Sequence, residues 1–124
     1  MSVLGTSLIV FAVAMLIGFV LAALNLHPAG KTPPLSARVA HGVLGAAGLG
    51  ALLLTMRQPA QGMREGVDTF RLDAAVLLGA ALLLGLGILV TVRAAPKSAG
   101  AVMALHVTVA MFGLAILAAY ASLG

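Results

Sequence analysis

The sequence predicts an all-α integral membrane protein, a four-helix bundle with up-down-up-down topology built as a tandem repeat of two transmembrane helices. Three observations predict this class. Of the 124 residues, 62% are apolar and only 8% are charged, against roughly a quarter charged in an ordinary soluble domain. Four apolar runs are long enough to cross a hydrocarbon layer of about 30 Å, which takes about 20 helical residues. Two of these runs carry a histidine at matching positions.

We expect the four helices, in chain order, at Val3 to Leu26, Pro33 to Met56, Leu72 to Val92, and Ala99 to Leu123. The first run lacks a charged n-region and is too long for the apolar region of a signal peptide, so it is expected to be a retained span. The connections HPAGKTPPLS, RQPAQGMREGVDTFR and RAAPKS contain the proline, glycine and charge that are typical of loops. Residues 1–124 therefore form a single transmembrane domain.

Composition also limits the class of function. The net charge of +4 comes from seven Lys and Arg residues scattered singly at segment ends, which suits anionic lipid headgroups rather than nucleic acid. The chain has no cysteine, which excludes disulfides and thiolate metal sites. The first helix has no acidic residue, in contrast to the small multidrug transporters. No Ser, Asp and His constellation or carboxylate cluster lies within the spans, so we do not expect catalysis on a small substrate.

Basic residues indicate an orientation. Counting Lys and Arg alone, the first and third connections with their helix ends carry Lys31, Arg38, Arg93 and Lys97. The second connection carries three arginines together with the acidic residues of the chain. The positive-inside rule then places both termini outside, in the periplasm if the membrane is a bacterial inner membrane.

An internal duplication organises the chain. Aligning His41 with His106 superposes residues 1–58 on residues 70–124. Each half is a helix, a short basic loop with proline, and a second helix containing His-x6-Gly. Because each half crosses the membrane twice, the repeats run parallel about an axis along the membrane normal. With Thr32 and Ser98 as predicted N-caps of the second and fourth helices, both histidines lie about 12 Å along their helices, at one depth.

Small residues follow each histidine at the positions one and two turns later on the same face. They are Gly45 and Gly48 after His41, and Ala110 and Gly113 after His106. This pattern predicts a flat slot for a planar ligand: a single b-type haem with the two imidazoles as axial ligands of its iron. Arg38, one turn before His41, is the predicted partner of a haem propionate, although an arginine at a helix end also snorkels to headgroups. The predicted cofactor-binding set is His41, His106, Gly45, Gly48, Ala110, Gly113 and Arg38, with the two histidines as the metal ligands.

The same residues allow a second interpretation. In a bundle, the second and fourth helices are diagonal, with roughly 7 to 9 Å between facing Cα atoms. Two imidazoles meet across that gap, whereas an iron atom between them needs the bundle to open by several Å. Each histidine would then donate a hydrogen bond to a carbonyl on the next helix, worth about 0.6 kcal/mol.

Two functions follow from these interpretations. With haem, the protein is an electron-transfer subunit that relays electrons between quinol and a membrane redox partner. Without haem, it is an accessory, assembly or structural subunit, oligomeric through the small-residue face of Gly42, Ala46 and Gly50.

Other residues are weaker candidates. His27 lies in a loop as a reserve ligand, and Met103 precedes His106 by one turn and is an alternative iron ligand. Asn25 is expected to cap the end of the first helix. Tyr120, near the end of the fourth helix, is expected to be an interfacial anchor.

The segments LSARVAHGVLGAAG and ALHVTVAMFGLAILAAYASLG resemble a group of small, functionally uncharacterised four-helix membrane proteins of proteobacteria. The resemblance covers nearly the whole chain, rests on the short motif His-x6-Gly, and implies the fold and a bacterial inner membrane but no activity. A looser resemblance links His41 and His106 to membrane b-type cytochromes. Those proteins commonly bind two haems through four histidines, and this chain has three histidines, so the two-haem arrangement is excluded.

Overall fold

The chain folds as four membrane-length helices. The computed structural model describes residues 2–27, 32–58 and 66–123, and this part of the chain contains helices and no strands. The helices are α1 (Val3–Leu26), α2 (Leu35–Thr55), α3 (Val67–Ala94) and α4 (Pro96–Leu123). All four are long and apolar enough to cross a membrane. The predicted all-α class with four transmembrane helices is confirmed.

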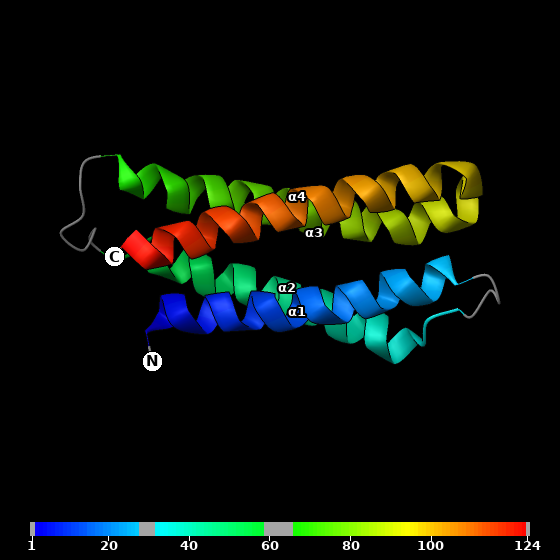
Figure 1. Cartoon of the computed structure of the whole chain (residues 1–124), viewed down its shortest axis with the longest axis horizontal. Coiled ribbons are helices and arrows are strands. Elements are labelled where there is room, and N and C mark those ends of the chain that lie inside the picture. Colours follow the sequence, from blue (N-terminus) through cyan, green and yellow to red (C-terminus); the bar gives the residue numbers. More distant parts are fainter. Residues whose placement is uncertain (1, 28–31, 59–65, 124) are drawn as a thin grey trace.

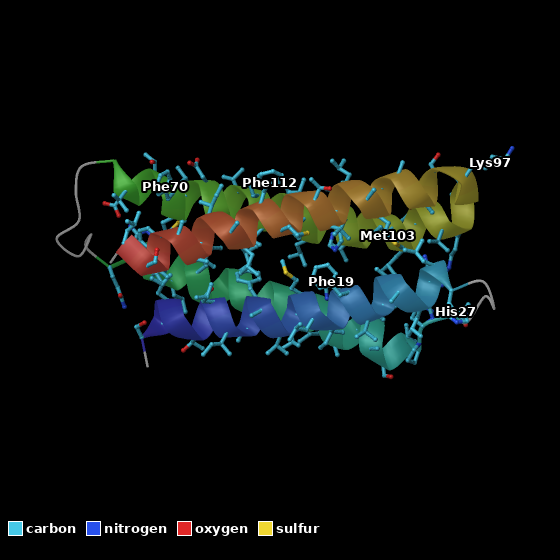
Figure 2. The ribbon with its side chains drawn as sticks, in the orientation of Figure 1. Phe19, His27, Phe70, Lys97, Met103 and Phe112 are labelled. Carbon is cyan, nitrogen blue, oxygen red and sulfur yellow. The ribbon has the colours of Figure 1, made fainter. Side chains whose placement is uncertain are left out.

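The helices form two antiparallel hairpins that pack against each other (Figure 1). Most contact between helices lies within the hairpins α1–α2 and α3–α4, and the hairpins meet through α2 against α3 and α1 against α4. Consequently α2 and α4 are diagonal. Both chain termini lie at one end of the bundle, here called the terminal face. Figure 2 shows His27 and Lys97 at the opposite end, here called the loop face, and Phe70 at the terminal face.

Helix boundaries differ from the sequence prediction at three starts. α1 has the predicted bounds, and the hydroxyl of Ser2 caps it by accepting a hydrogen bond from the Gly5 N–H at 3.0 Å. α2 begins at Leu35 after Pro34, which makes no side-chain cap. The prediction that Thr32 is the N-cap of this helix is therefore wrong. The fixed φ of Pro34 favours the helix start. Its carbonyl oxygen accepts hydrogen bonds from the N–H groups of Ala37 and Arg38 in the first turn, so the helix starts without a hydroxyl cap.

The second hairpin is longer than predicted at its starts. α3 begins at Val67, after Gly66 with a φ of 95° that favours glycine. Asp68 then lies in the first turn, where a negative charge interacts favourably with the helix dipole. α4 begins at Pro96, leaving Ala95 between the two helices. The prediction that Ser98 is an N-cap is wrong, because a proline at the first helical position needs no partner for an N–H.

A packed core occupies one half of the bundle. The buried apolar cluster is Phe11, Leu52, Ala74, Ala75, Leu78 and Leu117. These residues lie in the half of each helix nearer the terminal face. Large apolar side chains such as Leu16, Leu83 and Phe112 are more than half exposed on the outside of the helices, as expected for surfaces that contact lipid.

Candidate functional site

The structure brings the two predicted ligands together at the centre of the bundle. The rings of His41 and His106 have centroids 5.9 Å apart and planes inclined at 77°. They meet although the histidines lie at different distances from their helix starts, about 9 Å for His41 and about 15 Å for His106. The predicted common distance of about 12 Å is wrong, because α2 starts later and α4 earlier than expected. The rings come into contact because both histidines lie at the same depth in the bundle.

Each imidazole is fixed by a hydrogen bond within its own hairpin. Nδ1 of His41 lies 2.8 Å from the carbonyl oxygen of Ala14 on α1. Nδ1 of His106 lies 2.7 Å from the carbonyl oxygen of Ala81 on α3. A carbonyl oxygen only accepts, so Nδ1 carries the proton in both rings. In the neutral ring, Nε2 then keeps its lone pair, which is the form of histidine that binds a metal.

A glycine beside each ring makes these bonds sterically accessible. A Cβ atom added at Gly18 would lie 2.8 Å from Cε1 of His41, and one added at Gly85 would lie 3.1 Å from Cε1 of His106. Gly18 stands one helical turn after Ala14, and Gly85 one turn after Ala81. The unit that docks each ring is therefore an alanine carbonyl followed one turn later by a glycine.

The spacing of the two histidines does not predict this docking unit. It reads AMLIG in α1 and ALLLG in α3, so it occurs once in each half of the duplicated chain. The hydrogen bond spans 27 residues in the first hairpin and 25 in the second, so an alignment on the histidines alone puts the two units out of register.

The small residues that follow each histidine receive side chains from neighbouring helices. A Cβ atom at Gly48 would lie 3.1 Å from the ring of Phe11, and one at Gly113 would lie 2.9 Å from Leu78. A Cβ atom at Gly45 would be in ordinary contact with Leu82, at 3.7 Å. Ala110, the fourth residue predicted to line a slot, is half-buried. The space beside Gly48 and Gly113 on the core side of the ring pair is thus filled.

The other side of the ring pair has few buried side chains. Among the described residues of the half toward the loop face (15–27, 32–47, 82–95 and 97–112), Pro33, just before α2, is the one recorded as buried. In the half toward the terminal face, every helix contributes buried residues. The histidine pair lies at the boundary between these two halves.

The remaining candidates lie toward the loop face. Arg38 donates from Nε and Nη2 to the carbonyl oxygen of Pro33, at 3.2 and 2.8 Å, and so folds back over the start of its own helix. Met103 accepts a long contact of 3.8 Å from the side-chain amide of Asn25. Asn25 thus joins the two hairpins, and His27 takes the C-cap position of α1. His27 stands about 20 Å along α1 from Ala14, too far for its ring to join the pair.

Tyr120 is part of a separate cluster at the terminal face. It is buried, and the guanidinium of Arg71 lies over its ring at 5.9 Å. The ring packs inside the bundle because α3 begins early enough to place Arg71 above it, and the interfacial anchor stays a prediction. Among the described residues, no group of three or more His, Asp or Glu side chains is placed to hold a metal ion.

No protein-family model matches this chain, and neither a curated protein nor a solved structure shows significant similarity to it.

Proposed function

We propose that the protein is a multi-pass electron-transfer subunit of a bacterial inner membrane that holds one b-type haem between His41 and His106. The observation that carries the proposal is the geometry of the pair. Both rings direct Nδ1 to a carbonyl of their own hairpin, at 2.8 and 2.7 Å, and their centroids are 5.9 Å apart. Each repeat holds its ring by the same kind of hydrogen bond, and the two rings meet at one depth.

The pair offers two imidazoles as metal ligands. Their ring centroids are 5.9 Å apart and their planes are inclined at 77°, and His41 and His106 are the residues that would hold the iron of a haem. The macrocycle does not fit beside Gly48 and Gly113, where Phe11 and Leu78 are packed. Because the iron stands at the centre of a macrocycle, a haem held between the two rings would extend on both sides of them, and the helices would have to open to admit it.

The chain's own residues supply most of what such a site needs. A haem, when bound, supplies one-electron chemistry through its iron. The carbonyls of Ala14 and Ala81 hold the Nδ1 protons, and this raises the basicity of both Nε2 atoms as ligands. The packed core that begins at Phe11 excludes water from one side of the pair.

Location and partners follow from the same arrangement. The pair lies closer to the loop face, where Arg38, Arg93 and Lys97 stand without any acidic residue among the described ones. The positive-inside rule makes this face cytoplasmic and the termini periplasmic. Electrons would enter from quinol in the surrounding bilayer or leave to a membrane redox partner, with the protein as a subunit of a larger complex.

An absorption spectrum tests the proposal. Detergent-purified protein from a haem-replete host is expected to show a Soret band and, after reduction, α and β bands. Both His41→Ala and His106→Ala are expected to abolish these bands, since one imidazole alone leaves the iron without its second ligand. His27→Ala is the matched control and should retain them. A colourless wild-type protein under these conditions would overturn the proposal.

A second candidate is favoured by the filled packing beside Gly48 and Gly113. In a cofactor-free accessory or assembly subunit, the two histidines act only as hydrogen-bonding residues between helices. The face of α2 formed by Gly42, Ala46 and Gly50 then serves for oligomerisation, since a Cβ atom at Gly42 or Gly50 would meet nothing within 4 Å. Crosslinking in membranes should give an oligomer or a defined partner. Monomer alone would count against this candidate, and Gly42→Leu is the variant that should reduce the crosslink.

A further inference from the structure

A groove on the outside of the first hairpin lies on the loop-face side of the histidine pair. It is a hollow of about 380 Å³ between α1 and α2, lined by Leu16, Ile17, Val20, Ala37 and Ala40. Leu16 and Val20 are more than half exposed, so the groove opens outward, toward the lipid of a membrane. We propose that this groove binds an acyl chain of an anionic phospholipid whose headgroup is held by Arg38.

The composition of the groove suits a hydrocarbon chain. On α2, Ala37 lies one turn before His41 and Ala40 directly before it, so two small side chains leave space beside α1. Larger apolar side chains of α1 form the other wall, and the lining side chains are all hydrocarbon. A polar ligand would lose its hydrogen bonds to water there and gain none from these side chains. The occupant is therefore apolar along the length of the groove.

Arg38 supplies a cation at the loop-face end of the groove. Its Nε and Nη2 donate to the carbonyl oxygen of Pro33 at 3.2 and 2.8 Å, and Pro33 precedes Ala37 by four residues. These bonds use two of the five N–H groups of the guanidinium. The acidic residues of the described ranges, Asp68 and Asp73, lie in the first turns of α3 at the terminal face. A phosphate group at headgroup depth is thus the complement of Arg38.

The second repeat differs from the first at both parts of this site. When the repeats are aligned on their histidines, Leu105 takes the place of Ala40. Val102 takes the place of Ala37, and a methionine takes the place of Arg38. The larger side chains occupy the space that the two alanines leave open, and the methionine carries no charge. The site therefore belongs to the first hairpin, and we expect one such lipid per chain.

The headgroup gives this lipid its preference over others. An acyl chain gains little by leaving other lipid tails for the groove, because those tails are as apolar as its lining. A basic residue near the membrane surface raises the affinity for an anionic lipid about five-fold. Arg93 and Lys97 also stand at the loop face and attract anionic lipids in general, but neither belongs to the hairpin that carries the groove. Selection at the groove therefore depends on Arg38.

Native mass spectrometry of the delipidated full chain, titrated with dioleoyl phosphatidylglycerol, tests the headgroup. One lipid is expected to bind ahead of all others, about five-fold more tightly than dioleoyl phosphatidylcholine. Arg38→Gln should remove this preference. Arg93→Gln removes a charge at the same face but away from the groove and should retain it. Equal binding of the two lipids by the wild type, or equal losses in the two variants, would overturn the role of Arg38.

The same titration tests the groove. Ala40→Leu introduces the side chain of the second repeat and is expected to weaken binding of the first lipid several-fold, whichever headgroup it carries. Ala47→Leu is the matched control, because Ala47 is an exposed alanine two turns further along the same face of α2 and does not line the groove. Unfolding in micelles without added lipid shows whether either variant disturbs the fold. Equal lipid affinities for Ala40→Leu and wild type would overturn the inference.

Photolabelling of the wild type needs neither a variant nor a cofactor. Phosphatidylglycerol with a diazirine in one acyl chain, in phosphatidylcholine vesicles, is expected to label the lining residues of the groove more than their counterparts in α3 and α4. Excess unlabelled phosphatidylglycerol should suppress this labelling, and inorganic phosphate should not. Equal labelling of the two hairpins, or displacement by phosphate, would overturn the inference. Protection of the groove when protein is concentrated in the vesicles would mean that a second copy covers it instead.

Discussion

The two halves of the bundle differ in packing although they are built from the same kind of sequence. Toward the terminal face, Phe11, Leu52, Leu78 and Leu117 close into a core, and Leu52 and Leu117 are fully buried. Toward the loop face, where α1 and α3 carry residues as apolar as those of the core, Pro33 is the one described residue recorded as buried. The His41–His106 pair stands where one half gives way to the other. Helix association in a membrane depends on fit rather than on hydrophobicity, and only one half has that fit.

This comparison explains how the chain combines stability with a site. The packed half holds the hairpins together, and Ser7 adds a buried hydrogen bond across the first hairpin to the carbonyl of Gly48 at 2.9 Å. The other half keeps the helices paired within each hairpin with few buried side chains. The His41–His106 pair lies at the boundary between the two halves.

The largest effect is expected in the core. Leu52→Ala removes a fully buried side chain, and buried Leu→Ala changes cost about 2 to 5 kcal/mol in soluble proteins. In the unfolded state the Leu52 side chain contacts lipid or detergent instead of water, so the hydrophobic part of that cost is lost. Roughly 2 to 3 kcal/mol should remain, from lost packing. Unfolding in mixed micelles measures it. Leu86→Ala, at an exposed position of the other half, is the matched control and should change the free energy of unfolding by far less. Equal losses would show that the two halves are packed alike.

Arg71 offers the next test, because it joins three helices at the terminal face. Nη1 donates to the carbonyl oxygen of Thr55 at the end of α2 at 2.7 Å, and the guanidinium lies 5.9 Å from the ring centroid of Tyr120 on α4. Its ion pair with Asp68, at 3.6 Å, is half exposed on the carboxylate side and contributes little. Arg71→Gln is expected to lose about 1 to 2 kcal/mol of unfolding free energy.

The measurement for Arg71 is the same micellar unfolding. Arg93→Gln, a change of identical chemistry at the exposed loop end of α3, is its control and should be nearly neutral. Asp68→Asn should also be nearly neutral, because the bond to Thr55 and the ring of Tyr120 remain. If Asp68→Asn costs as much as Arg71→Gln, the stabilisation comes from the ion pair and not from the junction of the helices.

Much of the fold could be predicted from the sequence, because helix length and hydropathy are one-dimensional properties. The duplication around His41 and His106 also predicted that the rings lie at one depth. The docking units could not be predicted in the same way. Every residue has a backbone carbonyl, so the sequence does not show which one accepts a hydrogen bond from a side chain. Ala and Gly are also common in membrane helices, and Ala14 and Gly18 are recognised only from their contacts with the ring of His41.

The packed half could not be predicted either. Gly48 and Gly113 looked like the walls of a slot, and the sequence alone does not show that Phe11 and Leu78 fill the space beside them. Burial is decided by which side chains from separate helices reach the same point. The early start of α3, which puts Arg71 over Tyr120, was missed because charged residues at its first turns read as loop.

The smallest expected effect concerns the histidine pair itself and tests whether the two hairpins are equivalent. In cofactor-free protein, His41→Ala and His106→Ala each remove one hydrogen bond to an alanine carbonyl. Each of these carbonyls still accepts the helical N–H of the glycine one turn later, so no acceptor is orphaned and each loss is about 0.6 kcal/mol. Because the rings also touch each other, the double variant should lose less than the sum of the single losses, by about 0.5 kcal/mol.

A double-mutant cycle on micellar unfolding measures this coupling. Thr108→Ala is the control, since that hydroxyl bonds only within α4. Strictly additive losses would mean that the rings do not contact each other in the cofactor-free state. A much larger loss at one histidine would break the equivalence of the hairpins. Equal single losses with the expected coupling would show that the two hairpins hold their histidines equally. The duplicated docking units, and not the different helix starts, would then determine where the rings meet.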